Sequence, residues 1–140
     1  MRSRSVLAAA LLVTLTVLTA RSALGNEEPV AATSAPGFLP VGDIVTPVTN
    51  QGRLAGYVVV KASLEFATPM IAKTAEPWLP KIVDAWVRTM YGLAQRGHFG
   101  QGSVDPDMLK KQLLQSAIGT LKGSAPDDVL ITQALFSRAN

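Results

Sequence analysis

The segment from Leu54 to Phe66 constrains the fold most, because its side chains alternate between two chemically different faces. Apolar residues gather on one face: Leu54, Val58, Val60, Ala62, Leu64 and Phe66. The other face is mixed and becomes polar toward its end: Tyr57, Val59, Lys61, Ser63 and Glu65. Successive side chains of a strand point to opposite sides of a sheet. The pattern therefore predicts a half-buried strand whose apolar face packs on helices.

Two proline-marked starts predict the helices. Thr68-Pro69 and Asp105-Pro106 each place a capping side chain directly before a proline at the first helical position. After the first start, apolar residues recur at helical spacing as far as about Gln95: Ile71, Ala75, Trp78, Leu79, Ile82, Val83, Trp86, Met90 and Leu93. Pro77 and Pro80 interrupt this stripe, which predicts a kink or two shorter helices.

The second start predicts a helix that ends near Lys122-Gly123, where a cation and then a glycine form a stop signal. Its apolar residues are Met108, Leu109, Leu113, Ala117, Ile118 and Leu121. Two further strands are predicted. Phe38 to Val48 is an edge strand at best, because Pro40 and Pro47 remove ladder donors, and Val129 to Phe136 closes the chain. The order strand-strand-helix-helix-strand predicts a small α+β fold, with about three strands packed on two or three helices.

The first residues resemble a bacterial export leader. Arg2 and Arg4 precede an apolar run of about 15 residues, Val6 to Ala20. As a helix this run reaches roughly 22 Å, which is short of the ~30 Å hydrocarbon core of a bilayer. Two interpretations stay open: a signal peptide cleaved after about Gly25, or an uncleaved membrane anchor. We expect residues 1–25 to be this leader, 26–37 a flexible tether and 38–140 one folded domain.

The charge and the cysteine content exclude several classes of protein. The chain has 13 basic and 10 acidic residues, but Arg2, Arg4 and Arg21 of the leader account for the excess. The remainder is formally neutral, so its composition does not predict a nucleic-acid partner. The chain has no cysteine, which excludes disulfides, thiolate metal sites and cysteine nucleophiles.

The residues that could carry chemistry favour structural roles. His98, the one histidine, lies in a glycine-rich loop and has no neighbouring ligands in the sequence. Gly97, Gly100 and Gly102 do not form a phosphate-binding fingerprint, and Asp105 would repel an anion there. Scattered carboxylates and serines form no recognisable pair or elbow. We therefore predict no catalytic, cofactor or metal site.

Trp78 and Trp86 lie two helical turns apart. A carbohydrate or partner platform is one interpretation of this spacing. Core packing is favoured, because aliphatic residues share the same stripe.

Gly56 to Phe136 resembles the periplasmic domain of the FliL family, the flagellar basal-body-associated proteins. Tyr57–Phe66 (YVVVKASLEF) is similar to the family's Y-x-x-V-x-V-x-L-E strand. Leu79–Asp84 (LPKIVD) is similar to its L-P-x-I-x-D motif on the first helix. A leucine-bearing helix, Met108–Leu121, and a closing strand, Val129–Phe136, follow in the family's order.

The resemblance implies a stomatin-like domain on the periplasmic side of the inner membrane, held by one N-terminal anchor. It implies no catalysis and no cofactor. It implies association with flagellar stator or basal-body proteins, self-assembly and support of motility. The leader is shorter and richer in threonine than a secure anchor. A secreted periplasmic binding or assembly module unrelated to flagella is therefore the alternative.

Overall fold

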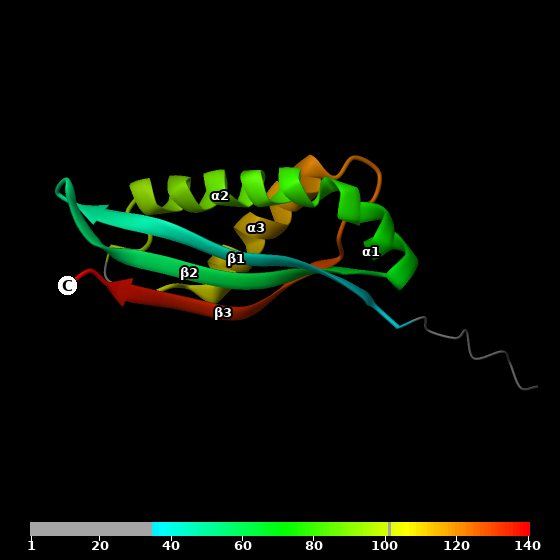
Figure 1. Cartoon of the computed structure of the whole chain (residues 1–140), viewed down its shortest axis with the longest axis horizontal. Coiled ribbons are helices and arrows are strands. Elements are labelled where there is room, and N and C mark those ends of the chain that lie inside the picture. Colours follow the sequence, from blue (N-terminus) through cyan, green and yellow to red (C-terminus); the bar gives the residue numbers. More distant parts are fainter. Residues whose placement is uncertain (1–34, 101) are drawn as a thin grey trace, which may run out of the picture. The chain divides into compact units, whose positions relative to one another are not determined.

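The computed structural model describes residues 35–100 and 102–140. They belong to one compact unit, Thr33–Asn140. Its elements follow in this order (Figure 1): β1 (Gly37–Asn50), β2 (Arg53–Phe66), α1 (Pro69–Ala75), the short 3₁₀ helix η1 (Glu76–Trp78), α2 (Leu79–Gln95), α3 (Pro106–Thr120) and β3 (Asp128–Arg138). This architecture confirms the predicted α+β class.

The predicted leader and nearly all of the predicted tether lie outside the described residues. Strand β1 begins at Gly37, at the boundary expected between tether and domain. Within residues 35–100 and 102–140, no helix is long and apolar enough to cross a membrane.

The three strands form one antiparallel sheet in the order β1-β2-β3, so the alternating segment is the central strand. The helices cover one face of this sheet (Figure 1). Strand β1 is an edge strand, as its prolines predicted, although it continues through both of them. One extra residue in β1, between Pro40 and Gly42, shifts the register there. The proline-bearing segment therefore pairs along its whole length as an edge strand.

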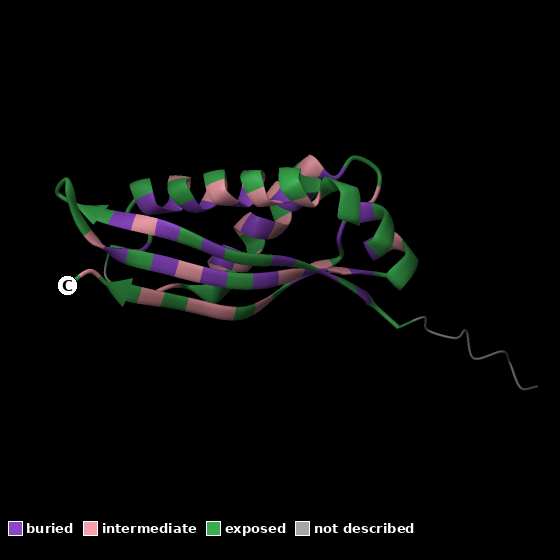
Figure 2. Cartoon of the chain, in the orientation of Figure 1, coloured by how far each residue is buried: buried purple, intermediate pink, exposed green. Residues whose placement is uncertain are grey.

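Burial alternates along β2 as the sequence predicted (Figure 2). Five of the six residues expected on the apolar face are buried against the helices: Val58, Val60, Ala62, Leu64 and Phe66. The expectation for Leu54 was wrong, since its side chain is 45% exposed. Leu54 lies at the hairpin end of the strand, beyond the register shift between Val48 and Thr49. The extra residue Ala55 places Leu54 opposite exposed Thr49, so Leu54 shares the sheet face that the helices do not cover.

Both predicted helix starts are confirmed. Thr68 Oγ1 accepts from the Ile71 N–H at 3.3 Å. Asp105 Oδ1 accepts from the N–H groups of Asp107 and Met108, at 3.0 and 3.3 Å. These bonds satisfy amides that have no partner within the first turn of a helix. The prolines at 77 and 80 divide the first helical segment into α1, η1 and α2, as predicted.

The two tryptophans occupy different environments. Trp86 is fully buried, and its Nε1 donates to the Leu113 carbonyl at 3.0 Å, which ties α2 to α3. Core packing is therefore confirmed for Trp86 but was wrong for Trp78, which is 36% exposed. The Lys81 ammonium lies 4.5 Å from the centre of the Trp78 ring. Trp78 does not point into the core with the other residues of the predicted apolar stripe. The 3₁₀ turn η1 has fewer residues per turn than an α-helix, which rotates the side chains that follow α1.

Candidate interaction surface

The sheet face that the helices leave uncovered, here called the open face, carries a row of aliphatic side chains. The strand register places Val45, Val59 and Leu135 side by side across all three strands. Val45 is 54% exposed and Leu135 is 55% exposed, while Val59 between them is half-buried. We call these three residues the aliphatic row. Three neighbouring aliphatic side chains at the surface form a continuous patch rather than scattered exposure.

The neighbouring rows of the open face differ in chemistry. On one side, Pro47 and exposed Tyr57 continue the apolar surface, and Ser137 adds a polar hydroxyl on β3. On the other side, Lys61 and Asp43 form an ion pair whose Nζ–Oδ1 distance is 3.3 Å. Both of these side chains are about half exposed, so the pair contributes little to stability. An apolar centre beside a solvated charged rim is the usual composition of a protein-binding surface.

The sequence signalled only part of this surface. It marked Tyr57 and Val59 on the mixed face of the central strand, but it did not single out Val45 or Leu135. Those two residues reach Val59 through strand pairing between segments far apart in the chain. A local pattern carries no information on which residue of another strand lies opposite.

The structure does not bring the candidate chemical residues together. His98 lies exposed in the loop after α2, and its backbone N–H donates to the Leu93 carbonyl at 3.1 Å. Its predicted place in an exposed loop is confirmed. Gly97 and Gly102 both have positive φ, so they shape turns of this loop. A small hollow lies where the loop meets β3, lined by Ala55, Gly100, Gly102, Phe136 and Arg138.

Within the part of the chain that the structure describes, no group of three or more His, Asp or Glu side chains is placed to hold a metal ion. No protein-family model and no curated protein matches this chain. The open face is therefore interpreted from its own geometry and chemistry.

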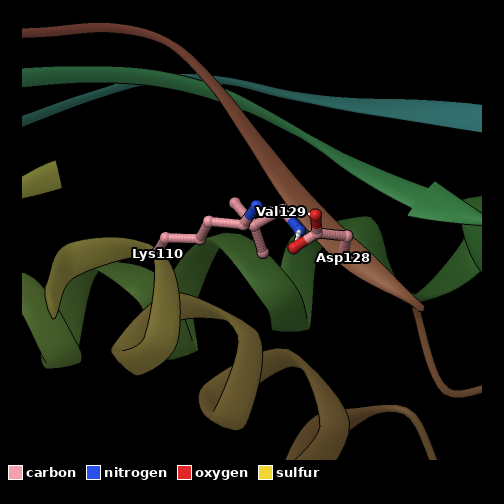
Figure 3. A network of polar contacts seen from close by, with 3 residues as sticks. All are labelled: Lys110, Asp128 and Val129. Atoms are coloured by element: carbon pink, nitrogen blue, oxygen red, sulfur yellow. Dashed lines mark hydrogen bonds and ion pairs between the residues drawn. The ribbon is translucent and has the colours of Figure 1, made fainter. Parts of the chain in front are cut away.

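One ion pair links the helical layer to the start of β3 (Figure 3). Lys110 of α3 donates through Nζ to Asp128 Oδ2 at 2.6 Å, and the Val129 N–H donates to Asp128 Oδ1 at 2.8 Å. The hydrogen bond from Lys110 holds the pKa of the Asp128 carboxyl below its usual value. Partial burial opposes that shift in pKa, and the Val129 amide adds to it.

Asp128→Asn is expected to lower the free energy of unfolding at pH 7 by about 0.5–1 kcal/mol, because solvent screens this partly exposed pair. Since the folded-state pKa is lowered, the stabilisation is full above the carboxyl's ordinary pKa and is lost as pH falls through the folded value. The difference in the free energy of unfolding between Asp128→Asn and the parent chain should therefore become smaller as the pH falls. Urea unfolding from pH 7 to pH 3 measures it. A difference that is constant with pH would contradict the assignment to this carboxylate.

Proposed function

We propose that the chain is a non-enzymatic interaction protein of the bacterial envelope that uses its open face to bind another protein. The aliphatic row carries this proposal, because an exposed apolar patch across three strands suits protein contact. The export-like leader favours action on the periplasmic side of the inner membrane, either anchored or exported.

The FliL resemblance supports flagellar stator or basal-body proteins as the partner, with motility as the readout. The segment Tyr57–Phe66 lies in the central strand, and Leu79–Asp84 begins α2. In this second motif, Leu79 packs against the core and Asp84 pairs with Arg88 at 2.8 Å. The second motif therefore lies away from the open face, whereas Tyr57 and Val59 of the first motif belong to that face. A secreted binding or assembly module unrelated to flagella is the second candidate, favoured by the short, threonine-rich leader.

The double variant Val45→Lys/Leu135→Lys tests the open face. Both side chains are more than half exposed, so we expect the fold and the thermal midpoint to persist. If a partner covers the open face, it would bury the two new lysine ammonium groups, and this should lower the affinity for that partner at least tenfold. Met70→Lys is the matched control, because Met70 is an exposed apolar residue on α1.

The measurement is swimming speed and co-purification after the variants replace the native chain in a flagellated host. Loss of motility with the double variant, but not with Met70→Lys, supports the flagellar role. Normal motility after complete deletion of the gene would reject that role. If the double variant then still loses a non-flagellar partner, the second candidate is supported. If the double variant co-purifies with the same partners as the parent chain, the open face is rejected as the binding surface.

A further inference from the structure

We propose that the free edge of β3 pairs antiparallel with β3 of a second copy, giving one six-stranded sheet across two chains. This inference concerns the edge of the sheet, whereas the proposed function concerns the open face. It therefore does not depend on the flagellar assignment.

The β1 edge is poorly suited to further pairing. Pro47 lies opposite Tyr57, and Pro40 lies opposite Ser63. The Ala55 carbonyl accepts from the Ala139 N–H, so Ala55 faces β3. Because the direction of the backbone groups alternates along a strand, Tyr57 and Ser63 face β3 as well. Both prolines therefore occupy positions whose backbone nitrogen faces away from the sheet. Two donors that an added strand would need are missing from this edge.

The β3 edge keeps its outward donors over its C-terminal half. The Ala139 N–H donates to the Ala55 carbonyl at 3.0 Å, which fixes the alternation at this end of the ladder. The amides of Ala134, Phe136 and Arg138 consequently point away from β2. Strand β3 contains no proline. From Gln133 to Arg138 this edge presents outward donors and acceptors at every second residue, which makes that stretch a template for strand addition. The extra residue Thr132 breaks the alternation just before it.

Among residues 35–100 and 102–140, only the first part of this edge has a polar partner. The Val129 N–H is bonded to the Asp128 carboxylate, and Lys110 lies against the same carboxylate (Figure 3). The regular free stretch therefore begins at Gln133, after the extra residue Thr132, and continues to Arg138. Lys110 reaches Asp128, so its side of α3 faces β3. Leu114 and Ile118 follow Lys110 at four-residue spacing and lie on that same side. Ile118, predicted on the buried stripe of α3, is instead 46% exposed.

The charges at the two ends of β3 select a second copy in antiparallel orientation. Asp127 and Asp128 precede the free stretch, and Arg138 ends it. When two such strands pair antiparallel about Ala134, Arg138 of each chain lies opposite Leu130 of the other. Of the two aspartates that precede Leu130, Asp128 already pairs with Lys110, so Asp127 is the one left to pair with Arg138. Parallel pairing would bring like charges together. The edge is thus electrostatically complementary to itself about a two-fold axis, as an isologous interface requires.

The absence of native cysteine permits a direct test in the full chain. Single variants Gln133→Cys, Ala134→Cys and Leu135→Cys surround the proposed axis. Opposed residues of paired strands have Cα separations of about 4.5–5.5 Å, within the range that a disulfide spans. We expect a disulfide-linked dimer from at least one of them under mild oxidation. Val45→Cys, more than half exposed on the other edge strand, is the control and should form no disulfide-linked dimer, although its intact β3 still pairs non-covalently.

A proline substitution provides the second test. Ala134→Pro removes an outward donor, so it should preserve the circular dichroism spectrum while weakening dimerisation at least tenfold by analytical ultracentrifugation. Val45→Pro makes the same change on β1 and should leave dimerisation unchanged. Absence of a dimer in the parent chain at any attainable concentration would overturn the proposal. Cross-linking at Val45 equal to that at the β3 positions, or mixed cross-links between Val45→Cys and Gln133→Cys chains, would overturn it as well.

Discussion

Trp86→Ala is expected to lower the free energy of unfolding by about 3–5 kcal/mol, the largest effect of any single side-chain truncation in this domain. The indole is fully buried between α2, α3 and the sheet, so its removal leaves a cavity in a close-packed core. Its Nε1 also donates to the Leu113 carbonyl, and the variant loses that link between the two helices. Small domains have only about 5–15 kcal/mol of stability in total.

Trp78→Ala is the matched control for Trp86, because it deletes the same side chain from a partly exposed position on η1. Its loss should be about 1 kcal/mol or less, from reduced apolar contact and the cation–π contact with Lys81. Urea unfolding followed by far-ultraviolet circular dichroism measures both variants. Equal losses at the two positions would show that Trp86 does not anchor the helical layer.

Gly56→Ala is expected to destabilise the domain by about 3 kcal/mol through a clash rather than a cavity. A Cβ atom at Gly56 would lie 2.2 Å from the Ser137 carbonyl oxygen and 2.8 Å from Phe136 Cζ. The first neighbour is backbone of the adjacent strand and cannot move without disturbing the β2–β3 ladder. The glycine thus lets β2 and β3 approach closely near the C-terminal end of the sheet.

Gly119→Ala is the control for Gly56, since an added Cβ there meets no atom within 4 Å and the residue lies in α3. It should raise stability by about 0.5 kcal/mol, because alanine loses less backbone entropy in a helix. Thermal and urea unfolding of both variants measure the contrast. A Gly56→Ala variant as stable as the parent would require a wider spacing between β2 and β3 than the structure has.

The fold was largely predictable because its signals are local. Alternation in the central strand and the two capped, proline-marked helix starts are each contained in a few residues. The errors come from packing that no local pattern contains. Ile118 continues the apolar spacing of α3, yet its side chain is 46% exposed, one position beyond the row of α3 residues that is buried: Leu109, Leu113, Ala117 and Leu121. Phe99 shows the reverse case: it lies in the glycine-rich loop and is fully buried, although no periodicity marked it.

The candidate surface was less predictable than the fold. Val45 belongs to a segment marked mainly by its prolines, and Leu135 to a short closing strand. Their common row with Val59 depends on the register of two strand pairs and on extra residues that shift both pairings. Register is a tertiary property, set by which face the helices bury and by the hairpin geometry. The sequence could therefore suggest a mixed face without showing that its apolar part is continuous.

The prolines of β1 have a consequence for assembly size. An edge-paired protein with two usable edges can add copies at both ends, and nothing then limits the growth of a fibre. Here Pro40 and Pro47 make one end of the sheet a terminus, so each chain has a single edge to offer. If two such edges pair as we propose, neither remains available, and assembly would stop at the dimer.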